Sequence, residues 1–292
     1  MVNYFDLTKT LKPQVCMTES FFSFSHSHVS SYQLLSARSK LYPLGIQGKR
    51  VLDLGCGSGR DCYIAAALVG TSGQVTGIDM TDDQLKVACE NLPVYAQAIG
   101  YTPNVRFVTG YIEALAAAGI EKNSIDICIS NCVINLSPDK KMVLEGVYEA
   151  LVAGGELHFA DVYASARLPE SVRTHQVLFG ECIGGALSTE DFLNITKRIG
   201  FTLPLKLQSS AVDINDPELL SLVGQTTFQS ITYRLFKLPS ITKSPINDRQ
   251  RTATYNGGIV GCESDYTLDQ VGKRLVFHVK GYLLESIRLL ML

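Results

Sequence analysis

Two cysteines of this 292-residue chain lie in segments that are not typical of a packed core, so a chemical role explains them better than packing does. Cys132 lies in Ser-Asn-Cys-Val-Ile-Asn, directly after an apolar run typical of a buried strand. Cys182 lies in the glycine-rich segment Gly-Glu-Cys-Ile-Gly-Gly. Turns and segments that follow strands carry binding and catalytic side chains more often than strand interiors do. These two thiols are therefore the first candidates for chemistry.

The other cysteines have simpler explanations, because a free cysteine usually behaves as a small buried hydrophobe. Cys128, inside Ser-Ile-Asp-Ile-Cys-Ile, is predicted to be core. Cys56 in a glycine turn and Cys89 on a helix are predicted to be structural. Cys62 opens a helix, where the pKa of a thiol can fall, and a packing role is an equal alternative. Eight cysteines are too sparse for a disulfide scaffold, which favours reduced thiols and the cytoplasm.

A glycine-rich turn follows the first apolar run of the middle region. Its spacing is G-x-G-x-G, starting at Gly55 and continuing through Gly57, and Asp53 stands two residues before it. Dinucleotide oxidoreductases usually have G-x-G-x-x-G with a pyrophosphate on the helix, and a carboxylate at Asp53 would repel that group. It would suit a cationic ligand end, such as the amino group of a methionyl moiety. Asp79 ends the next run, where an acid can bind a ribose diol. An ordinary tight turn, and an N-cap role for Asp61, are the alternatives.

Hydrophobic patterns place these residues at the ends of strands. Apolar runs predict strands at residues 50–54, 73–80, 105–109, 124–129 and 155–160. Helical patterns lie between them, at residues 61–69, from Thr81 onward and at 139–151. Such alternation predicts a parallel, doubly wound sheet. Residues 203–213 and 228–238 then alternate as antiparallel strands would.

Composition excludes several other classes of protein. The chain is 46% hydrophobic, enough for a packed core, and its net charge is -2. A nucleic-acid partner calls for a basic excess, so none is expected. The start, MVNYFDLTKT, lacks the features of a secretory signal. No stretch of about 18 residues is predominantly apolar, so no membrane span is expected.

Several longer motifs closely resemble those of arsenite methyltransferases, over roughly residues 50–262. They are VLDLGCGSGRDCY, GQVTGIDMT, GYIEAL, SNCVINLSPDK, GGELHFADVY, RTHQVLFGECIGGAL, TYRLFKL and YNGG. The family transfers methyl groups from S-adenosylmethionine to trivalent arsenic. The resemblance implies a Rossmann-like, doubly wound methyltransferase sheet followed by a smaller α+β arsenic-binding domain. The expected divisions are an N-terminal arm at 1–46, the cofactor domain at 47–190, the arsenic-binding domain at 191–240 and a divergent segment at 241–292.

The resemblance also implies which thiols bind arsenic. The family cysteines that match Cys132 and Cys182 hold the arsenic, and Cys16 resembles an N-terminal cysteine that takes part. The chain departs from the family at residues 37–45, where a Tyr-Gly-Cys-Gly element with a further cysteine is absent. It departs again after Asp269, where the tail becomes apolar. His26 and His28 lack further ligand partners and are predicted to lie in a solvated loop.

S-adenosylmethionine is the expected cofactor, and the expected contacts all follow strands or lie in the glycine turn. They are Asp53, Gly55, Gly57, Asp61, Asp79, Met80, Ile112, Glu113 and Asn131. Glu113 has the alternative of an acid at the start of a helix. Glutathione or thioredoxin is expected as the thiol reductant. Trivalent arsenicals and small thiols are the expected partners of a monomeric protein.

Valence predicts the preferred substrate. Trivalent arsenic is soft and prefers thiolate ligands, and three sulfurs would leave its lone pair as the nucleophile. Inorganic arsenite has three ligand positions, whereas monomethylarsenite has two, which Cys132 and Cys182 can fill. For inorganic arsenite a third sulfur would come from Cys16 or glutathione. A methyltransferase for a small organic molecule and a non-catalytic arsenic-binding protein remain the rival functions.

Overall fold

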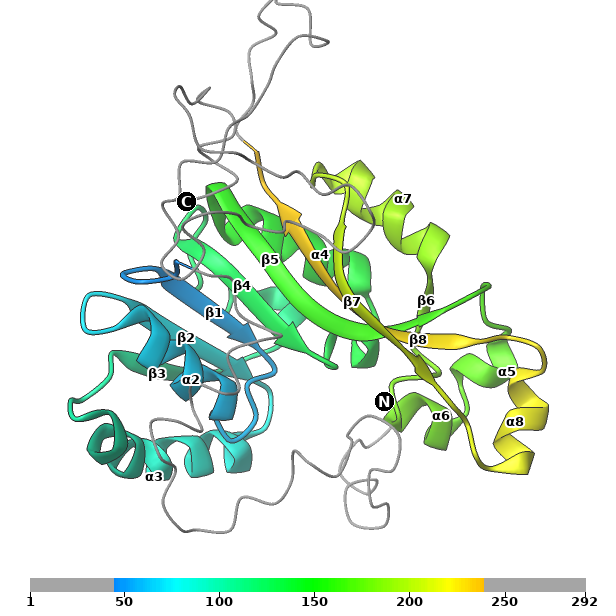
Figure 1. Cartoon of the computed structure of the whole chain (residues 1–292), viewed down its shortest axis with the longest axis horizontal. Helices are drawn as coiled ribbons and strands as arrows, with labels where there is room; N and C mark the ends of the chain where they lie inside the picture. The colour runs from blue at the N-terminus through cyan, green and yellow to red at the C-terminus, as the bar shows by residue number, and fades with distance from the viewer. Residues whose placement is uncertain (1–44, 239–292) are drawn as a thin grey trace, which may run out of the picture.

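The computed structural model describes residues 45–238. In this part of the chain eight strands form one sheet, with the order β3-β2-β1-β4-β5-β8-β7 and β6 paired to β5 (Figure 1). The strands are β1 Arg50–Leu54, β2 Gln74–Asp79, β3 Val105–Thr109, β4 Ile125–Asn131, β5 Leu151–Ala164, β6 Leu187–Ser188, β7 Leu205–Val212 and β8 Phe228–Phe236. The helices are α2 Arg60–Val69, α3 Asp82–Ile99, α4 Lys140–Ala150, α5 Glu170–Arg173, α6 Gln176–Gly180, α7 Thr189–Ile199 and α8 Pro217–Val223, with short 3-10 helices η4 Ile112–Ala114 and η5 Ile134–Leu136.

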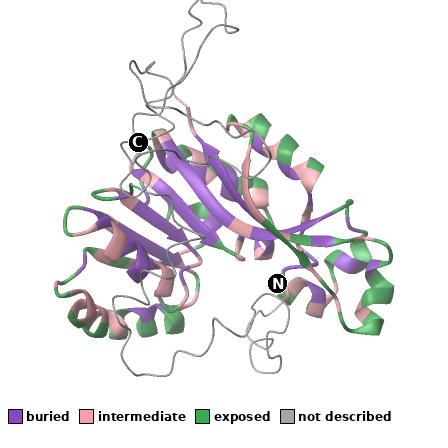
Figure 2. Ribbon diagram, viewed as in Figure 1, coloured by how far each residue is buried: buried purple, intermediate pink, exposed green. Residues whose placement is uncertain are grey.

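The parallel half of the sheet confirms the predicted doubly wound arrangement. β1 pairs in parallel with β2 on one side and with β4 on the other, and β5 pairs in parallel with β4. Successive strand side chains point to opposite faces, so Val51 joins the core under α2 whereas Leu52 joins the core under α4. The central strands are therefore buried on both faces and flanked by exposed helix surfaces (Figure 2).

The antiparallel half continues the same sheet. β8 pairs with β5 over nine residue pairs, from Glu156↔Phe236 to Ala164↔Phe228, and β7 pairs with the other edge of β8. The antiparallel strands expected at 203–213 and 228–238 are confirmed within a few residues. They extend the sheet of the parallel half rather than forming a second sheet, and the division into domains at residues 190 and 191 remains a prediction.

Two local features differ from the sequence-based expectation. The fifth strand begins at Leu151, and the Gly-Gly pair expected to form a turn before it lies inside the strand, where Gly154 has φ 88 and the pairing with β4 shifts register. A glycine in the left-handed region typically marks a bulge. The helices α5, α6, α7 and α8 were not predicted; α5, α6 and α8 are too short to show a clear period, whereas α7 has an amphipathic pattern, with Phe192 and Thr196 buried, that the prediction missed. No helix within residues 45–238 is long and apolar enough to cross a bilayer.

Candidate active site

The glycine turn and Cys132 meet where the order of the strands reverses. In open α/β sheets ligands bind beyond the carboxyl ends of the strands at this reversal, which here lies between β1 and β4. A Cβ at Gly55 would lie 2.4 Å from a methyl group of Val133, the residue after Cys132. Only a glycine at position 55, which also has φ 65, lets the turn after β1 pack this closely on the segment after β4.

Asp79 holds the glycine turn against the end of β2. One of its carboxylate oxygens accepts the backbone N–H of Gly57 at 2.9 Å, and the other accepts the N–H of Thr81 at 2.9 Å. A Cβ at Gly57 would meet nothing nearer than a side-chain oxygen of Gln84 at 3.9 Å. The turn therefore presents its backbone to open space. The Asp79 carboxylate has lone pairs left that can accept further hydrogen bonds. These residues fit an adenosyl ligand.

Asp53 lies beneath the turn rather than on its open side. It is buried, and its carboxylate accepts the Cys62 thiol at 3.3 Å. Burial, followed by the charge of Asp61, raises the pKa of Asp53 well above its usual value. Burial likewise raises the pKa of Cys62, so the alternative of an activated thiol at this helix start is wrong. Gly59 is the N-cap of α2, which excludes that role for Asp61; Asp61 pairs with Arg60 instead.

Cys132 and Cys182 lie together although fifty positions separate them. The Cys182 thiol donates to the backbone carbonyl oxygen of Cys132 at 3.1 Å. Both residues have positive φ, 55 and 63, and only Asn123 shares this property among the non-glycine residues of 45–238. Such conformations cost free energy and occur preferentially at functional sites. Cys182 is buried and Cys132 is half-buried.

Asn135 fastens the two cysteine-bearing segments to each other. Its side-chain amide donates to the carbonyl oxygens of Val162 at 2.6 Å and Cys182 at 3.2 Å. Its backbone N–H donates to the buried carboxylate of Asp161 at 3.0 Å. A Cβ at Gly185 would lie 1.9 Å from the Asn135 carbonyl oxygen. The turn that carries Cys182 is therefore seated directly on the segment that carries Cys132.

Lys140 supplies positive charge to the same region. Its ammonium group donates to the carbonyl oxygen of Ser137 at 2.9 Å. Burial, with the positive charge of Arg173, lowers the pKa of Lys140, whereas the negative charge of Asp161 opposes that effect. Neither Asn135 nor Lys140 was predicted as a functional residue. The only signal in the sequence is their place in the motif around Cys132.

Comparison with known proteins finds methyltransferases. Residues 47–200 match the methyltransferase domain family. The arsenite methyltransferases of Rattus norvegicus and Homo sapiens are 49% and 46% identical to this chain, over 78% and 75% of it and 61% and 58% of their own lengths. A crystal structure of an arsenic (III) S-adenosylmethionine methyltransferase from Chlamydomonas reinhardtii is 50% identical, with a TM-score of 0.75, over 82% of this chain and 79% of that one.

The chain belongs to the arsenite methyltransferase family. It spans about 60% of the length of the curated arsenite methyltransferases it matches. The predicted resemblance and the predicted Rossmann-like methyltransferase fold are confirmed. The assignment of individual site residues stays a prediction.

The remaining cofactor candidates of this methyltransferase domain lie around the carboxyl ends of the strands. Met80 follows β2 and is 54% exposed, and Asn131 is exposed at the end of β4. Ile112 is buried in η4. Glu113 stands in the first turn of η4 and accepts the Ser137 hydroxyl at 2.5 Å. This contact joins Glu113 to the segment after Cys132. Glu113 therefore does more than stand at the start of a helix, which was the alternative interpretation.

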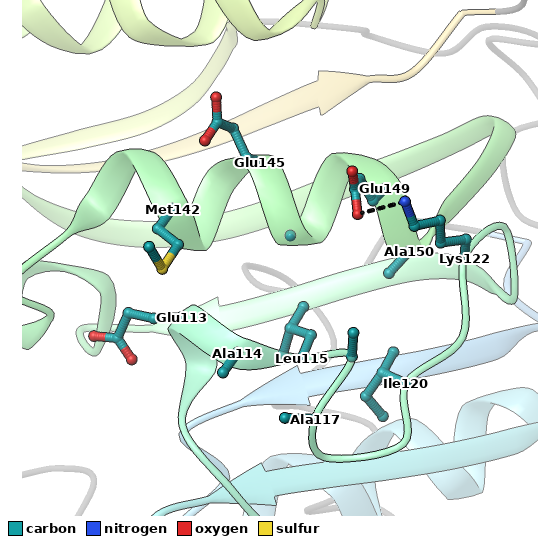
Figure 3. Close-up of a pocket in the computed structure, with 12 residues that line it drawn as sticks. Glu113, Ala114, Leu115, Ala117, Ile120, Lys122, Met142, Glu145, Glu149 and Ala150 are labelled. Carbon is teal, nitrogen blue, oxygen red and sulfur yellow. Dashed lines mark ion pairs between the residues drawn. The ribbon is translucent and has the colours of Figure 1, made fainter.

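A hollow of about 390 Å³ lies between α4 and the segment 113–122. Figure 3 shows apolar side chains lining it, with Glu113 and Met142 at one end and the ion pair of Lys122 with Glu149 at the other. No cysteine lines it. The hollow is therefore separate from the thiol pair, and it touches the predicted cofactor residues only through Glu113.

The remaining cysteines fall into three groups: buried, exposed, and outside the described residues. Cys128 is fully buried, which confirms its prediction as core, and Cys56 is buried in the turn. Cys89 is exposed on α3, so it is not part of the core, and its structural assignment stays a prediction. Cys16 and Cys262 lie outside the described residues, as do His26 and His28. Within residues 45–238 there is no group of three or more His, Cys, Asp or Glu side chains that could hold a metal ion.

Proposed function

We propose that this protein transfers the methyl group of S-adenosylmethionine to trivalent arsenic held by Cys132 and Cys182. The observation that carries the proposal is the 3.1 Å contact of the Cys182 thiol with the Cys132 carbonyl oxygen. This contact lies beside the glycine turn, at the reversal of the strand order. Similar proteins support the substrate, since two of them are named arsenite methyltransferase and arsenic (III) S-adenosylmethionine methyltransferase.

The residues of the turn would bind the cofactor, which supplies an electrophilic methyl group on a sulfonium. Asp79 fixes the N–H groups of Gly57 and Thr81 and keeps lone pairs for a ribose diol. Met80, Ile112, Glu113 and Asn131 would surround the rest of the ligand. Asp53 would support the turn from below, because its buried carboxylate accepts a hydrogen bond from the Cys62 thiol.

The thiol pair would present arsenic to that methyl group. Each thiol gives up its proton when it binds, and Lys140 interacts electrostatically with Cys182. The arsenic lone pair is the nucleophile, so no general base is needed. Catalysis is then mainly positioning, which can contribute several kcal/mol. The positive φ of both cysteines is consistent with backbone shaped for that geometry.

The first test replaces the thiols. Cys132→Ser and Cys182→Ser should each abolish arsenic methylation, because a hydroxyl is a harder and weaker ligand for arsenic, while binding of S-adenosylmethionine persists. Speciation of the arsenic products and calorimetry with the cofactor measure the two effects. Cys89→Ser, on the exposed face of α3, is the control and should keep full activity. Methylation by either active-site variant would contradict the proposal, and arsenic binding without any product in the natural chain would favour a non-catalytic protein.

The second test concerns the substrate. Two protein thiols fill the two free positions of monomethylarsenite, whereas inorganic arsenite needs a third sulfur, from Cys16 or glutathione. We therefore propose that initial rates are higher with monomethylarsenite, with glutathione or thioredoxin as the reductant. A clear preference for inorganic arsenite under matched conditions would overturn this part.

The monomeric state and the cytoplasmic location belong to the same proposal and are testable by light scattering and microscopy.

A further inference from the structure

A second pair of thiols lies under the glycine turn, away from Cys132 and Cys182. Cys56 is the residue between Gly55 and Gly57, and Cys62 lies in the first turns of α2. The position that a Cβ would occupy at Gly77 of β2 is 2.6 Å from the Cys62 sulfur and 2.7 Å from the Cys56 sulfur. The two sulfurs are thus at most twice that distance apart. The absence of a side chain at Gly77 provides the space that both occupy.

The surroundings of this pair keep both thiols shielded from water. Cys56 is 8% exposed and Cys62 is fully buried. Cys62 donates to the Asp53 carboxylate at 3.3 Å, whereas the contact of the Cys56 thiol with the Gly57 carbonyl oxygen is 3.9 Å long. Burial, the Cys56 thiol and the Asp53 charge all raise the pKa of Cys62. Oxidation proceeds through thiolate, so this pair is a poor redox centre.

We propose that Cys56 and Cys62 form a second dithiol site, which takes a trivalent arsenical carrying one organic substituent. Such an arsenical, R–As(OH)₂, reacts with two thiols to give R–As(S–)₂ and two waters. Two arsenic–oxygen and two sulfur–hydrogen bonds break, two arsenic–sulfur and two oxygen–hydrogen bonds form, and no oxidation state changes. The reaction therefore needs no oxidant, and each thiol proton leaves with an arsenic-bound hydroxyl as water.

The ligand set favours this occupant over a metal ion. Structural zinc takes four ligands, and residues 45–238 contain no group of even three suitable side chains. An arsenical with one substituent requires only two. Bonds from thiolate to a soft metal are about 2.3 Å long, so two sulfurs that share one atom are at most about twice that far apart. The upper limit on the separation of the Cys56 and Cys62 sulfurs, set by their distances to the Gly77 Cβ position, is compatible with this span.

Occupation of this site should oppose binding of the cofactor. The inference rests on the proposed function only in that S-adenosylmethionine binds at the glycine turn. Cys56 belongs to that turn, and its neighbour Gly57 is tied to Asp79. Packed interiors have little free volume, so an arsenic atom beside the buried Cys62 must displace the turn. Excess methylarsenical would then inhibit the enzyme by competing with its methyl donor.

The test uses phenylarsine oxide on the full chain with Cys132→Ser and Cys182→Ser, which removes the proposed substrate thiols. Native mass spectrometry should show that this double variant still binds the phenylarsenic group. Adding Cys62→Ala should remove one bound equivalent, whereas adding Cys128→Ala, at another fully buried cysteine, should not. Equal binding with and without Cys62→Ala would overturn the inference. Retained binding of S-adenosylmethionine by the Cys62→Ala chain checks that the turn is intact.

Calorimetry then measures the coupling to the cofactor. Phenylarsine oxide should weaken S-adenosylmethionine binding to the double variant by at least about tenfold, or roughly 1.4 kcal/mol, and 2,3-dimercaptopropanol should restore it. With Cys62→Ala the weakening should vanish. If the double variant without arsenical fails to bind the cofactor, the proposed function fails. If it binds the cofactor equally well with the arsenical, the second site fails and the proposed function stands.

Discussion

At the scale of single residues, the site depends on side chains that hold other residues in place. Asn135 contributes nothing that could bind arsenic, yet it bonds to the carbonyl oxygen of Cys182 and to β5 through Val162. It is 3% exposed, and a buried amide of this kind is stabilising only while all its partners remain. We therefore expect Asn135 to help position the Cys182 segment against the Cys132 segment.

Asn135→Asp tests this dependence with almost no change of shape. The new carboxylate would lose two N–H donors and face two carbonyl oxygens, so we expect a loss of about 1–3 kcal/mol in the free energy of unfolding. With Cys62→Ala added to remove the second proposed dithiol site, affinity for phenylarsine oxide should fall with it. Urea denaturation and native mass spectrometry measure the two effects. Asn194→Asp, exposed on α7, is the control, and a chain with Asn135→Asp that behaves like this control would show that Asn135 does not position Cys182.

At the scale of elements, the site is a junction of two connections that leave the sheet. One follows β4 and carries Cys132, and the other, residues 180–186, precedes β6 and carries Cys182. Gly185 is where they touch, since its Cβ position lies 1.9 Å from the Asn135 carbonyl oxygen. The contact is with backbone, which cannot rotate aside as a side chain could.

Gly185→Ala should therefore separate the two connections. We expect a cost of about 1–3 kcal/mol from the overpacking and a loss of methylation greater than the loss of folded protein. Gly180→Ala is a matched control in the same segment, because nothing lies within 4 Å of its Cβ position. Arsenic product formation and thermal unfolding, measured side by side, distinguish the variants. Full methylation by the Gly185→Ala chain would show that this seating is not required.

At the scale of the whole molecule, β5 joins the parallel and antiparallel halves. Between it and β8 lies the ion pair of Glu156 with Arg234, whose side chains are only 8% and 6% exposed, with a shortest N···O distance of 2.7 Å. Removing one member of a buried ion pair leaves the other charge buried without a partner. This costs more stability than replacing both members with apolar residues.

Arg234→Met should lower the free energy of unfolding by about 3–5 kcal/mol. The double variant with Glu156→Leu in addition should recover a substantial part of the loss, because no isolated charge then remains buried. Urea denaturation followed by circular dichroism measures both. A double variant no more stable than the single one would show that the ion pair is not the origin of the effect. Arg167→Met, at an exposed pair with Asp191, should cost far less.

The sequence predicted most parts of the fold that follow a period, although the amphipathic helix α7 was missed. β1 and β3 match their predicted ranges because apolar runs bounded by glycine and acids indicate buried strands, and family motifs identified Cys132 and Cys182. The bulge at Gly154 and the short helices α5, α6 and α8 have no such period. Asn135 and Lys140 could not be assigned because their roles depend on contacts with residues 161–182, which form only after folding.

The nine residue pairs between β5 and β8 also have a practical consequence. A fragment that stopped after the methyltransferase match at residue 200 would leave one side of β5 unpaired along an almost wholly buried strand. Unprotected apolar strand edges recruit other chains. Fragments prepared for crystallography or for arsenic biosensors should therefore extend at least through Phe236, or they will precipitate.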